Sequence, residues 1–218
     1  VGLIAGSGLG VDELVSEIRA ARDRAAGGVL GVNIMVAVTK FRELVRAAMA
    51  EGIDLVVAGA GFSRDVFAWG REFGVPVPKQ SDVTITSGYP LESNLIQSGK
   101  ALLNADIVTK KGGVVILMSA CDEGAGPLFY ETLAERPAPE MVIEWVGSGK
   151  ASPTGGPMAA RVRELLKTKK LIVVTDGVAP EKLADMEMIY APTVQEALQV
   201  AAKYHPNAEV TILPVGGS

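Results

Sequence analysis

Apolar strands alternate with amphipathic helices along the whole chain, and this alternation limits the fold more than any other feature. Leu30 to Val38 is a largely apolar run, and Val114 to Ser119 and Leu171 to Thr175 repeat the pattern further on. Strands without a polar face are typical of parallel sheets that helices cover on both sides. Because parallel strands need a crossover between them, the sequence predicts an α/β fold with right-handed helical connections.

The length of 218 residues is enough to bury a substantial core, as one α/β domain or as two small ones. A single domain agrees better with the usual size of such folds. We therefore expect residues 1–218 to form one doubly wound αβα sandwich of three layers, Rossmann-like or flavodoxin-like, around a mainly parallel sheet. The strand order stays open, because alternation does not say which strands pair.

Two closely spaced prolines mark a change of character along the chain. The stretch Gly74 to Gln80 contains Pro76 and Pro78, which exclude a helix and allow at most an edge strand. Residues 1–80 carry seven Arg and two Lys, whereas residues 81–218 carry three Arg and nine Lys. We interpret the stretch as a junction between two halves of the domain, residues 1–75 and 76–218.

Charge and composition exclude several classes of partner. The net charge of -4 and the pI near 5.2 argue against a nucleic acid or an anionic membrane surface, since both attract a basic face. No apolar run reaches the roughly 20 residues that a membrane span needs, and no signal peptide opens the sequence. A single cysteine, Cys121, and a single histidine, His205, leave few soft ligands for a metal. We expect a cytoplasmic protein without a metal site.

Two glycine-rich turns follow predicted strands and precede predicted helices. Backbone N–H groups at such turns, together with the positive end of the next helix, can hold a phosphate or another small anion. A plain turn is the alternative for the first of them, because the acidic residue that dinucleotide-binding loops place about 20 residues further on, at the end of a second strand, is missing: Asp23 lies in the predicted helix. The second turn repeats the same pattern more weakly. The anion-binding candidates are Gly6, Ser7, Gly8, Gly10, Gly59 and Gly61.

Three single residues invite a functional interpretation beside a plainer one. Cys121 follows the end of a predicted strand, where sites in α/β folds gather, but a buried structural thiol is the commoner outcome. Asp176 also follows a strand, and capping of the next helix is its default role. His205 is expected to end a helix.

Residues 2 to about 75 resemble the FMN-dependent nitronate monooxygenase and enoyl-reductase family, whose members are TIM barrels. The matching segments are GLIAGSGLG, GVNIMV, LVVAGAG and GVPV, in this order. The resemblance implies an early part of a barrel that lacks the first strand. The flavin-phosphate loops of that family lie in its later half, and its catalytic histidine has no counterpart here. We therefore expect no bound FMN.

The stretch SDVTITSGYPLESNLIQSGK, residues 81–100, joins a predicted strand, a Gly-Tyr-Pro turn and a helix with Pro90 in its first turn. With KKGGVVILMSACDEGAG and LIVVTD further on, it makes residues 76–218 similar to the C-terminal domain of nickel-dependent lactate racemases. That resemblance implies that Gln97 and Lys100, one helical turn apart, bind the carboxylate of the substrate.

The match departs from the family pattern at three positions, and at one of them only Gly88 precedes Tyr89 where the family has a pair of glycines. Ile96 stands where the family has a tyrosine, and Glu92 stands where it has an aspartate. The family's amino-terminal domain, which carries the nickel-pincer cofactor on a lysine and the histidine pair that moves the proton, has no counterpart in this sequence. His205 alone cannot supply two-base racemisation, so we expect neither a catalytic residue nor the nickel-pincer cofactor.

These observations favour an engineered fusion of two families that has no catalytic activity of its own. Two alternatives stay open: a module that binds a small phosphate or carboxylate, and a lactate-racemase-type domain that needs a partner chain. An uncovered edge of the sheet would favour a homodimer.

Overall fold

A computed structural model describes residues 2–59, 63, 65–76 and 79–217. The chain divides into two compact units, Val1–Pro78 and Lys79–Ser218, in place of the single domain expected from the sequence. The boundary falls inside the predicted junction. Within the described residues, no helix is both long enough and apolar enough to cross a membrane.

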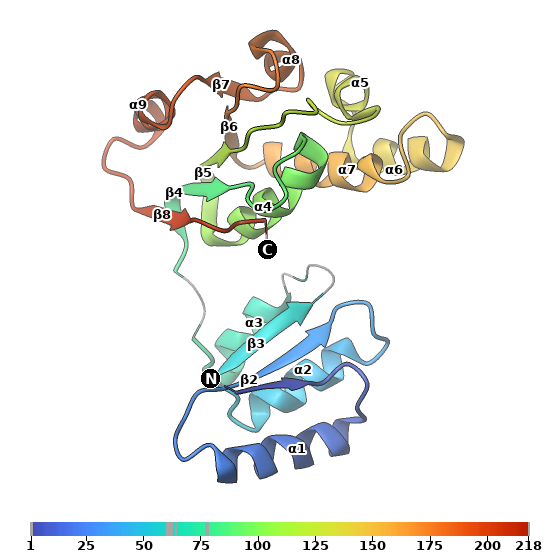
Figure 1. The fold of residues 1–218 in the computed structure, drawn as a ribbon, viewed down its shortest axis with the longest axis vertical. Coiled ribbons are helices and arrows are strands. Elements are labelled where there is room, and N and C mark those ends of the chain that lie inside the picture. The colour runs from blue at the N-terminus through green and yellow to red at the C-terminus, as the bar shows by residue number, and fades with distance from the viewer. Residues whose placement is uncertain (1, 60–62, 64, 77–78, 218) are drawn as a thin grey trace. The chain divides into compact units, whose positions relative to one another are not determined.

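The first unit is a three-stranded parallel sheet in the order β1-β2-β3, with three helices (Figure 1). Neighbouring strands follow one another in the chain, so right-handed crossovers bring the helices to one face of the sheet. The elements are β1 (Gly2–Ala5), α1 (Val11–Arg24), β2 (Leu30–Met35), α2 (Phe41–Ala50), β3 (Leu55–Gly59) and α3 (Asp65–Phe73).

The core of the first unit lies between that face of the sheet and the helices. Ile4, Val32 and Val56 are neighbours across the three strands and pack with the buried side chains of the helices. Alternate residues of each strand point to the opposite face. The fully or nearly buried members of this core are Leu14, Ile18, Leu30, Val32, Ile34, Phe41, Leu44, Val45, Ala48, Met49, Ile53 and Trp69.

The second unit is a five-stranded parallel sheet in the order β7-β6-β5-β4-β8. Figure 1 shows it with helices on both faces. The strands are β4 (Ser81–Ser87), β5 (Thr109–Met118), β6 (Lys170–Val174), β7 (Ile189–Ala191) and β8 (Val210–Leu213). The helices are α4 (Leu95–Val108), α5 (Phe129–Ala134), α6 (Pro139–Ser148), α7 (Gly155–Leu166), α8 (Pro180–Asp185) and α9 (Val194–Tyr204).

The strand order explains the two covered faces. From β4 to β7 the chain moves in one direction across the sheet, and it then returns to place β8 beside β4. With right-handed crossovers, this reversal sends α9 to the face opposite the other helices. Two separate hydrophobic clusters follow: one joins Leu117 and Val173 to α4, α5, α7 and α8, and the other joins Ile116 and Ile172 to α9.

The predicted α/β class with parallel strands is confirmed, but the prediction of one continuous sheet is wrong. Strands β1 to β3 pair only with one another, and β4 to β8 form the second sheet. Each hydrophobic cluster consists of residues from a single unit. Because each sheet buries its apolar side chains against its own helices, the packing of the cores does not need a shared sheet.

The start of α4 also differs from the prediction. The helix begins at Leu95 rather than near Pro90, and Asn94 is its N-cap residue. Residues 88–94 form a loop in which the Leu91 N–H donates to the Gly88 carbonyl at 2.8 Å. The Asn94 side chain accepts a hydrogen bond from the Gln97 N–H, which fixes the first helical turn.

Candidate functional site

The loops that follow β4 and β5 are bound to each other at the carboxyl edge of the five-stranded sheet. The Cys121 N–H donates to the Glu92 carbonyl and the Glu123 N–H to the Ser93 carbonyl, both at 2.8 Å. The Leu95 N–H at the start of α4 donates to the Gly124 carbonyl at 3.2 Å. Because these are backbone bonds, the two loops and the first turn of α4 form one connected frame.

Buried hydroxyl groups lie beneath this frame. The Ser98 and Ser119 oxygens are 2.7 Å apart, and the Ser98 hydroxyl also lies 2.9 Å from the Asn94 carbonyl. The Cys121 thiol donates to the Ser119 oxygen at 3.3 Å and is fully buried. The prediction that the Cys121 thiol is buried is therefore confirmed.

Asn94 connects the two loops through its side chain. Its Oδ1 accepts from the Gln97 N–H at 3.0 Å, and its Nδ2 donates to Glu123 Oε2, also at 3.0 Å. Glu123 follows Cys121 after a predicted strand, where sites in α/β folds gather, but neither its bond to Asn94 nor a role for Asn94 was predicted. The signal for Asn94 was available, because Asn is among the preferred N-cap residues. The pairing with Glu123 depends on two loops 29 residues apart and has no local signal.

Gln97 and Lys100 lie in the first two turns of α4, and both are exposed. Ser98 and Gly99, between them, are buried against the unit. Neither the Gln97 amide nor the Lys100 ammonium makes a hydrogen bond or an ion pair within the part of the chain that the structure describes. The positive end of the α4 dipole lies at the same end of the helix. Two donors are therefore available to an anion near the carboxyl edge.

The loop after β6 is the third loop at this edge, and it is bonded to the loop after β5. The Thr175 hydroxyl donates to the Ala120 carbonyl at 2.8 Å, and the Gly177 N–H donates to the same oxygen at 3.0 Å. Asp176, between them, is exposed and does not cap α8, whose N-cap residue is Ala179. The expected capping role of Asp176 is thus wrong, because Pro180 already occupies the first helical turn and removes a donor that a cap would serve.

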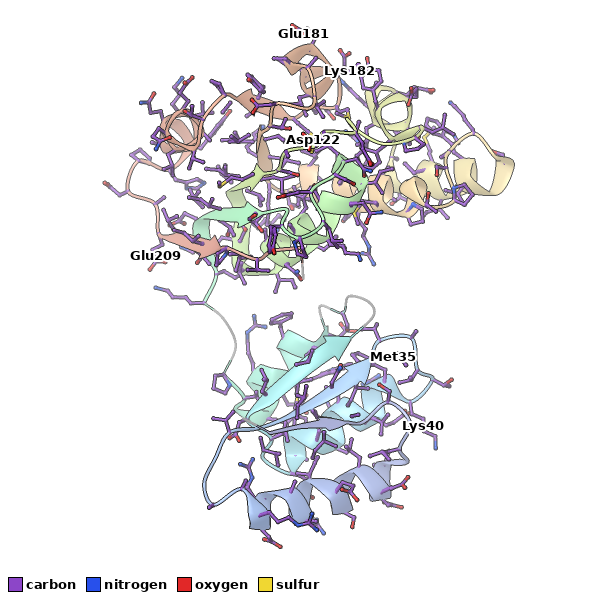
Figure 2. All side chains as sticks on the ribbon, in the orientation of Figure 1. Met35, Lys40, Asp122, Glu181, Lys182 and Glu209 are labelled. Carbon is purple, nitrogen blue, oxygen red and sulfur yellow. The ribbon has the colours of Figure 1, made fainter. Side chains whose placement is uncertain are left out.

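Exposed carboxylates follow β5 and β6. Asp122 (labelled in Figure 2) and Glu123 come from the loop after β5, and Asp176 comes from the loop after β6. All three are exposed, so water screens them, and Glu123 already accepts the hydrogen bond from Asn94.

The glycine-rich turn of the first unit uses several of its own donors. The Gly6 N–H donates to the Asn33 carbonyl at 2.9 Å, and the Ser7 hydroxyl accepts from the Met35 N–H at 2.8 Å. The Gly10 N–H donates to the Glu13 carboxylate at 3.2 Å, so an acidic group of the protein already occupies the start of α1. These hydrogen bonds are enough to hold the turn in place without a bound anion.

The remaining glycines of the predicted anion sites differ in their surroundings. Gly8 has open space around it, and Gly59 is the last residue of β3, where its carbonyl accepts from the Val36 N–H at 2.8 Å. Gly61 lies outside the described residues. Anion binding at Gly6, Ser7, Gly8, Gly10 and Gly59 stays a prediction.

His205 ends α9, as predicted, and its ring lies far from the carboxyl edge in the topology. Its Nε2 is 3.1 Å from the carbonyl of Gly112, which lies in the amino-terminal half of β5. Among the described residues, no three His, Cys, Asp or Glu side chains gather closely enough to hold a metal ion. The described residues therefore do not fit a metal centre.

Ion pairs, rather than a binding site, occupy the amino edge of the same sheet. The Lys110 ammonium lies 2.8 Å from Asp82 Oδ1, and the Glu209 N–H donates to Asp82 Oδ2 at 2.9 Å. Bonding to Lys110 lowers the pKa of Asp82, and the bond with Lys79 lowers the pKa of Glu209, which is labelled in Figure 2. These contacts attach the start of β8 to β4 and β5.

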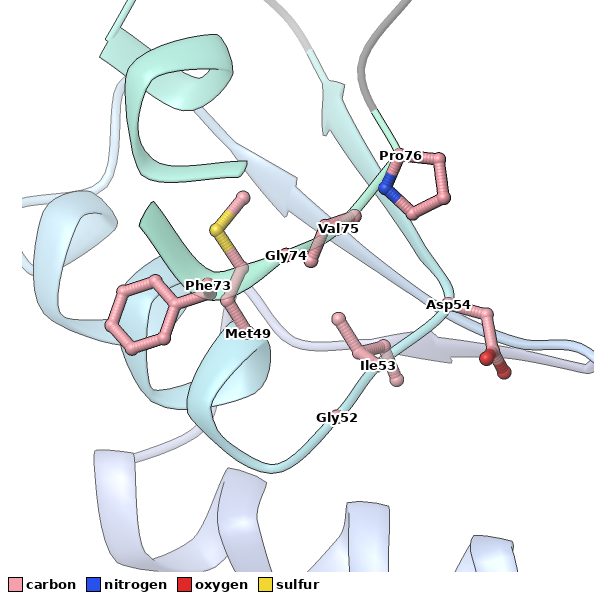
Figure 3. A pocket seen from close by; sticks show the side chains of 8 residues that line it. All are labelled: Met49, Gly52, Ile53, Asp54, Phe73, Gly74, Val75 and Pro76. Atoms are coloured by element: carbon pink, nitrogen blue, oxygen red, sulfur yellow. The ribbon is translucent and has the colours of Figure 1, made fainter. Parts of the chain in front are cut away.

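A hollow of about 240 Å³ lies in the first unit (Figure 3). It opens at the amino end of β3, away from the glycine-rich turn after β1. The only acidic side chain in its lining, Asp54, is already bound to the Leu30 N–H and to Arg22, both at 2.8 Å, and the first of these contacts lowers the pKa of Asp54 most. The lining residues are Met49, Gly52, Ile53, Asp54, Phe73, Gly74, Val75 and Pro76.

Comparison with known proteins identifies the second unit. Residues 77–218 match the family model of the lactate racemase C-terminal domain. A lactate racemase from Thermoanaerobacterium thermosaccharolyticum is 32% identical over 174 residues, which cover 75% of this chain and 41% of that protein. A lactate racemase from Lactiplantibacillus plantarum is 29% identical over 138 residues, which cover 62% of this chain and 32% of that protein.

The fold agrees with these matches. The structure of the lactate racemase apoprotein from Thermoanaerobacterium thermosaccharolyticum superposes with a TM-score of 0.59 at 26% identity, covering 85% of this chain and 50% of that one. The chain thus spans half or less of the length of these relatives.

The comparisons bear differently on the sequence-based expectations. The similarity of residues 76–218 to lactate racemases is confirmed. They give no support to a flavin-family origin of residues 2–75, to a fusion or to an engineered protein, and the matches to the Thermoanaerobacterium protein extend upstream of residue 77. They favour the alternative of a lactate-racemase-type domain over an inactive scaffold.

Proposed function

The chain belongs to the lactate racemase C-terminal domain family, and from this membership we propose that it contributes the carboxylate-binding part of a site that isomerises a small 2-hydroxy acid. The relatives that it matches are lactate racemases, so lactate is the first substrate to test. The binding part is the first two turns of α4 with the loops that hold them.

One observation carries this proposal: two exposed donors, the Gln97 amide and the Lys100 ammonium, stand one helical turn apart without partners among the described residues. A carboxylate offers two oxygens, and it can accept one hydrogen bond from an amide and a charge-assisted bond from an ammonium. The amino end of α4 adds a favourable potential for the anion. No hydrogen bond or ion pair of these two groups within the described residues has to break before the substrate binds.

The frame beneath α4 supports this role. Asn94 fixes the first turn through the Gln97 N–H, and the Ser98 hydroxyl, which lies near Ser119, joins the helix to the β5 loop. Because both contacts are buried or half-buried, they restrict the direction in which Gln97 and Lys100 extend. Binding of a small ion benefits from such preorganisation, since less side-chain freedom is lost.

The proposal assigns the bond-breaking step to no described residue. Inversion at the carbon that bears the hydroxyl group requires groups that remove and return a hydrogen on opposite faces. The family resemblance implies a nickel-pincer cofactor for this step, held by the amino-terminal domain of the relatives. The described residues do not fit a metal centre, so their part in the reaction is to bind and orient the substrate carboxylate. The chain acts together with a partner that supplies the chemistry.

The carboxylate-binding role is tested by titrating ¹⁵N-labelled protein with L-lactate, D-lactate and inorganic phosphate. We expect both lactate enantiomers to shift the backbone amide signals of Gln97 and Lys100. The shifts should saturate with concentration, because each enantiomer carries the same carboxylate. Lys100→Met should abolish the saturation. Lys203→Met, which removes an exposed lysine of α9, is the matched control and should leave it unchanged.

Two outcomes would contradict the proposal. One is an absence of saturable shifts on α4 with either enantiomer, and the other is equal loss of binding in the Lys100 and Lys203 variants. Phosphate that shifts only the signals of Gly6 to Gly10 would instead support the anion-binding module. In a racemisation assay, we expect no turnover by the chain alone and turnover after addition of the amino-terminal half of a nickel-loaded relative.

A further inference from the structure

One face of the three-stranded sheet has no cover from the described helices of its own unit. Leu3 pairs with Gly31, and Gly31 pairs with Leu55, so these residues share a face. Met35 lies four residues after Gly31 on β2 and therefore points the same way. The exposed fractions of Leu3, Met35 and Leu55 are 55%, 43% and 42%. We call this surface, Leu3, Ala5, Gly31, Asn33, Met35, Leu55, Val57 and Gly59, the open face.

Side chains of neighbouring residues lie over both glycines of the open face. A Cβ atom on Gly31 would lie 2.8 Å from Leu3 Cδ1 and 3.2 Å from Leu55 Cβ, so the end of the Leu3 side chain lies over the glycine. A Cβ atom on Gly59 would lie 2.7 Å from Asn33 Oδ1, so the asparagine covers that position. Because this space is filled, the two glycines leave no hollow for a small ligand. The open face is therefore better matched to an extended protein surface.

The open face contains no charged residue. The chain as a whole carries a net charge of -4, so two copies repel each other over most of their surface. On this face no like charges would meet, and a strongly charged partner would find nothing to pair with. Parallel sheets are almost always covered on both sides, and an apolar patch of this kind marks an interaction surface.

A buried oxygen at the centre of the face lacks a hydrogen bond. Asn33 lies in the middle of β2, the central strand, and its Oδ1 has no partner among the described residues. Unsatisfied buried polar atoms are rare in native proteins. A two-fold axis near Asn33 would bring two such amides together, and a rotation of each amide would let each donate to the oxygen of the other.

We propose that two copies of this chain associate through the open face, sheet against sheet, around a two-fold axis that passes near Asn33. Two sheets that pack in this way interleave their outward side chains at a separation of about 10 Å. The association differs from pairing at an exposed strand edge, which the sequence suggested. It places Leu3, Met35, Leu55 and Val57 in a shared apolar layer.

Sedimentation of the full chain over a wide concentration range tests the proposal. We expect a monomer–dimer equilibrium whose dissociation constant rises about 100-fold or more in Leu55→Lys, because a charge would enter the apolar layer. Ile212→Lys is the matched control. Ile212 is 65% exposed on β8, an edge strand of the other sheet, and its substitution should leave the dimer unchanged. Circular dichroism and Val57→Gln, a milder change on the same face, exclude misfolding as the cause.

A charge swap at Asn33 tests the two-fold axis. Asn33→Asp and Asn33→Lys should each be monomeric, because like charges would meet across the axis, whereas an equal mixture should form a heterodimer. A wild-type chain that stays monomeric at every concentration would overturn the proposal. So would a dimer that survives in Leu55→Lys, a dimer lost in Ile212→Lys alone, or a mixture of the two Asn33 variants that stays monomeric.

Discussion

The Lys169 ammonium lies 2.5 Å from the Asp106 carboxylate, and the two side chains are only 8% and 5% exposed. The pair joins α4 to the residue just before β6, far from either edge loop of the candidate site. Removing one member of a buried pair leaves a charge in a poorly solvated place. We expect Lys169→Met to lower the free energy of unfolding by about 3 kcal/mol, measured by urea denaturation.

The control for this pair is Lys111→Met, because Lys111 is exposed and its ammonium makes no hydrogen bond or ion pair within the described residues. It should change stability by less than about 0.5 kcal/mol. The double variant Asp106→Leu with Lys169→Met should recover much of the loss, since apolar groups then replace both charges. A double variant that is no more stable than Lys169→Met would contradict this account.

Gly177 lies so close to the preceding loop that no side chain fits. A Cβ atom there would lie 1.8 Å from the Cys121 carbonyl oxygen and 2.6 Å from that of Ala120. These are backbone atoms of the candidate-site frame, so moving them would break the hydrogen bonds that hold the loops together. We expect Gly177→Ala to cost at least about 2 kcal/mol of stability and to weaken lactate binding.

Gly147 supplies the opposite case for comparison with Gly177. It lies in α6, and a Cβ atom on it would have no neighbour within 4 Å, so Gly147→Ala should stabilise the protein by about 0.5–1 kcal/mol. Thermal unfolding of both variants measures the difference. Equal changes in stability for the two substitutions would show that the close contact at Gly177 does not cause the destabilisation.

Asp54 makes the stability of the first unit depend on pH. Its bond from the Leu30 N–H, followed by that from Arg22, lowers the pKa of Asp54 in the folded state. A carboxyl group with a lowered pKa stabilises the fold above its unfolded pKa of about 3.9, and this contribution is lost as pH falls through the folded pKa. We therefore expect the first unit to lose stability below about pH 4.

The measurement uses Trp69 fluorescence in a Trp145→Phe background, because Trp69 then reports the first unit alone. Asp54→Asn should reduce the acid-dependent loss of stability, and the rest comes from groups such as Glu51 and Glu72, whose pKa values are lowered by hydrogen bonds from Arg19 and Arg46. Glu17→Gln should not reduce the loss, because it changes an exposed carboxylate of α1 that makes no ion pair within the described residues. An unchanged pH dependence in Asp54→Asn would assign the loss to other carboxyl groups.

Residues 79–218 are expected to fold without the first unit. Both hydrophobic clusters of the second unit consist entirely of its own residues, and its five strands pair only with one another. The truncated chain should keep a cooperative thermal transition and its dispersed NMR spectrum. A chain that begins at Leu95 instead lacks β4, which pairs with both β5 and β8, and it should not fold. Loss of cooperativity in residues 79–218 would contradict this prediction.

The candidate site was predictable only in part. Gln97 and Lys100 were found through a family resemblance, and their spacing of one helical turn agrees with the structure. Local preference could have identified Asn94 as the cap of α4. The pairs Asn94–Glu123 and Ser98–Ser119 could not be predicted, because each joins residues that are more than 20 positions apart. Only the pairing of β4 with β5 brings their loops together.

The sequence by itself determined that the strands are parallel and where each lies, since apolar runs such as those of β5 and β6 must be buried on both faces. It also located the boundary near Gly74 to Gln80. Only the tertiary structure decided that there are two sheets, that β8 returns beside β4, and that one face of the first sheet has no described helix of its own unit over it. The physical reason is that periodicity fixes which side chains of a strand point together, whereas strand pairing depends on backbone groups that every residue shares.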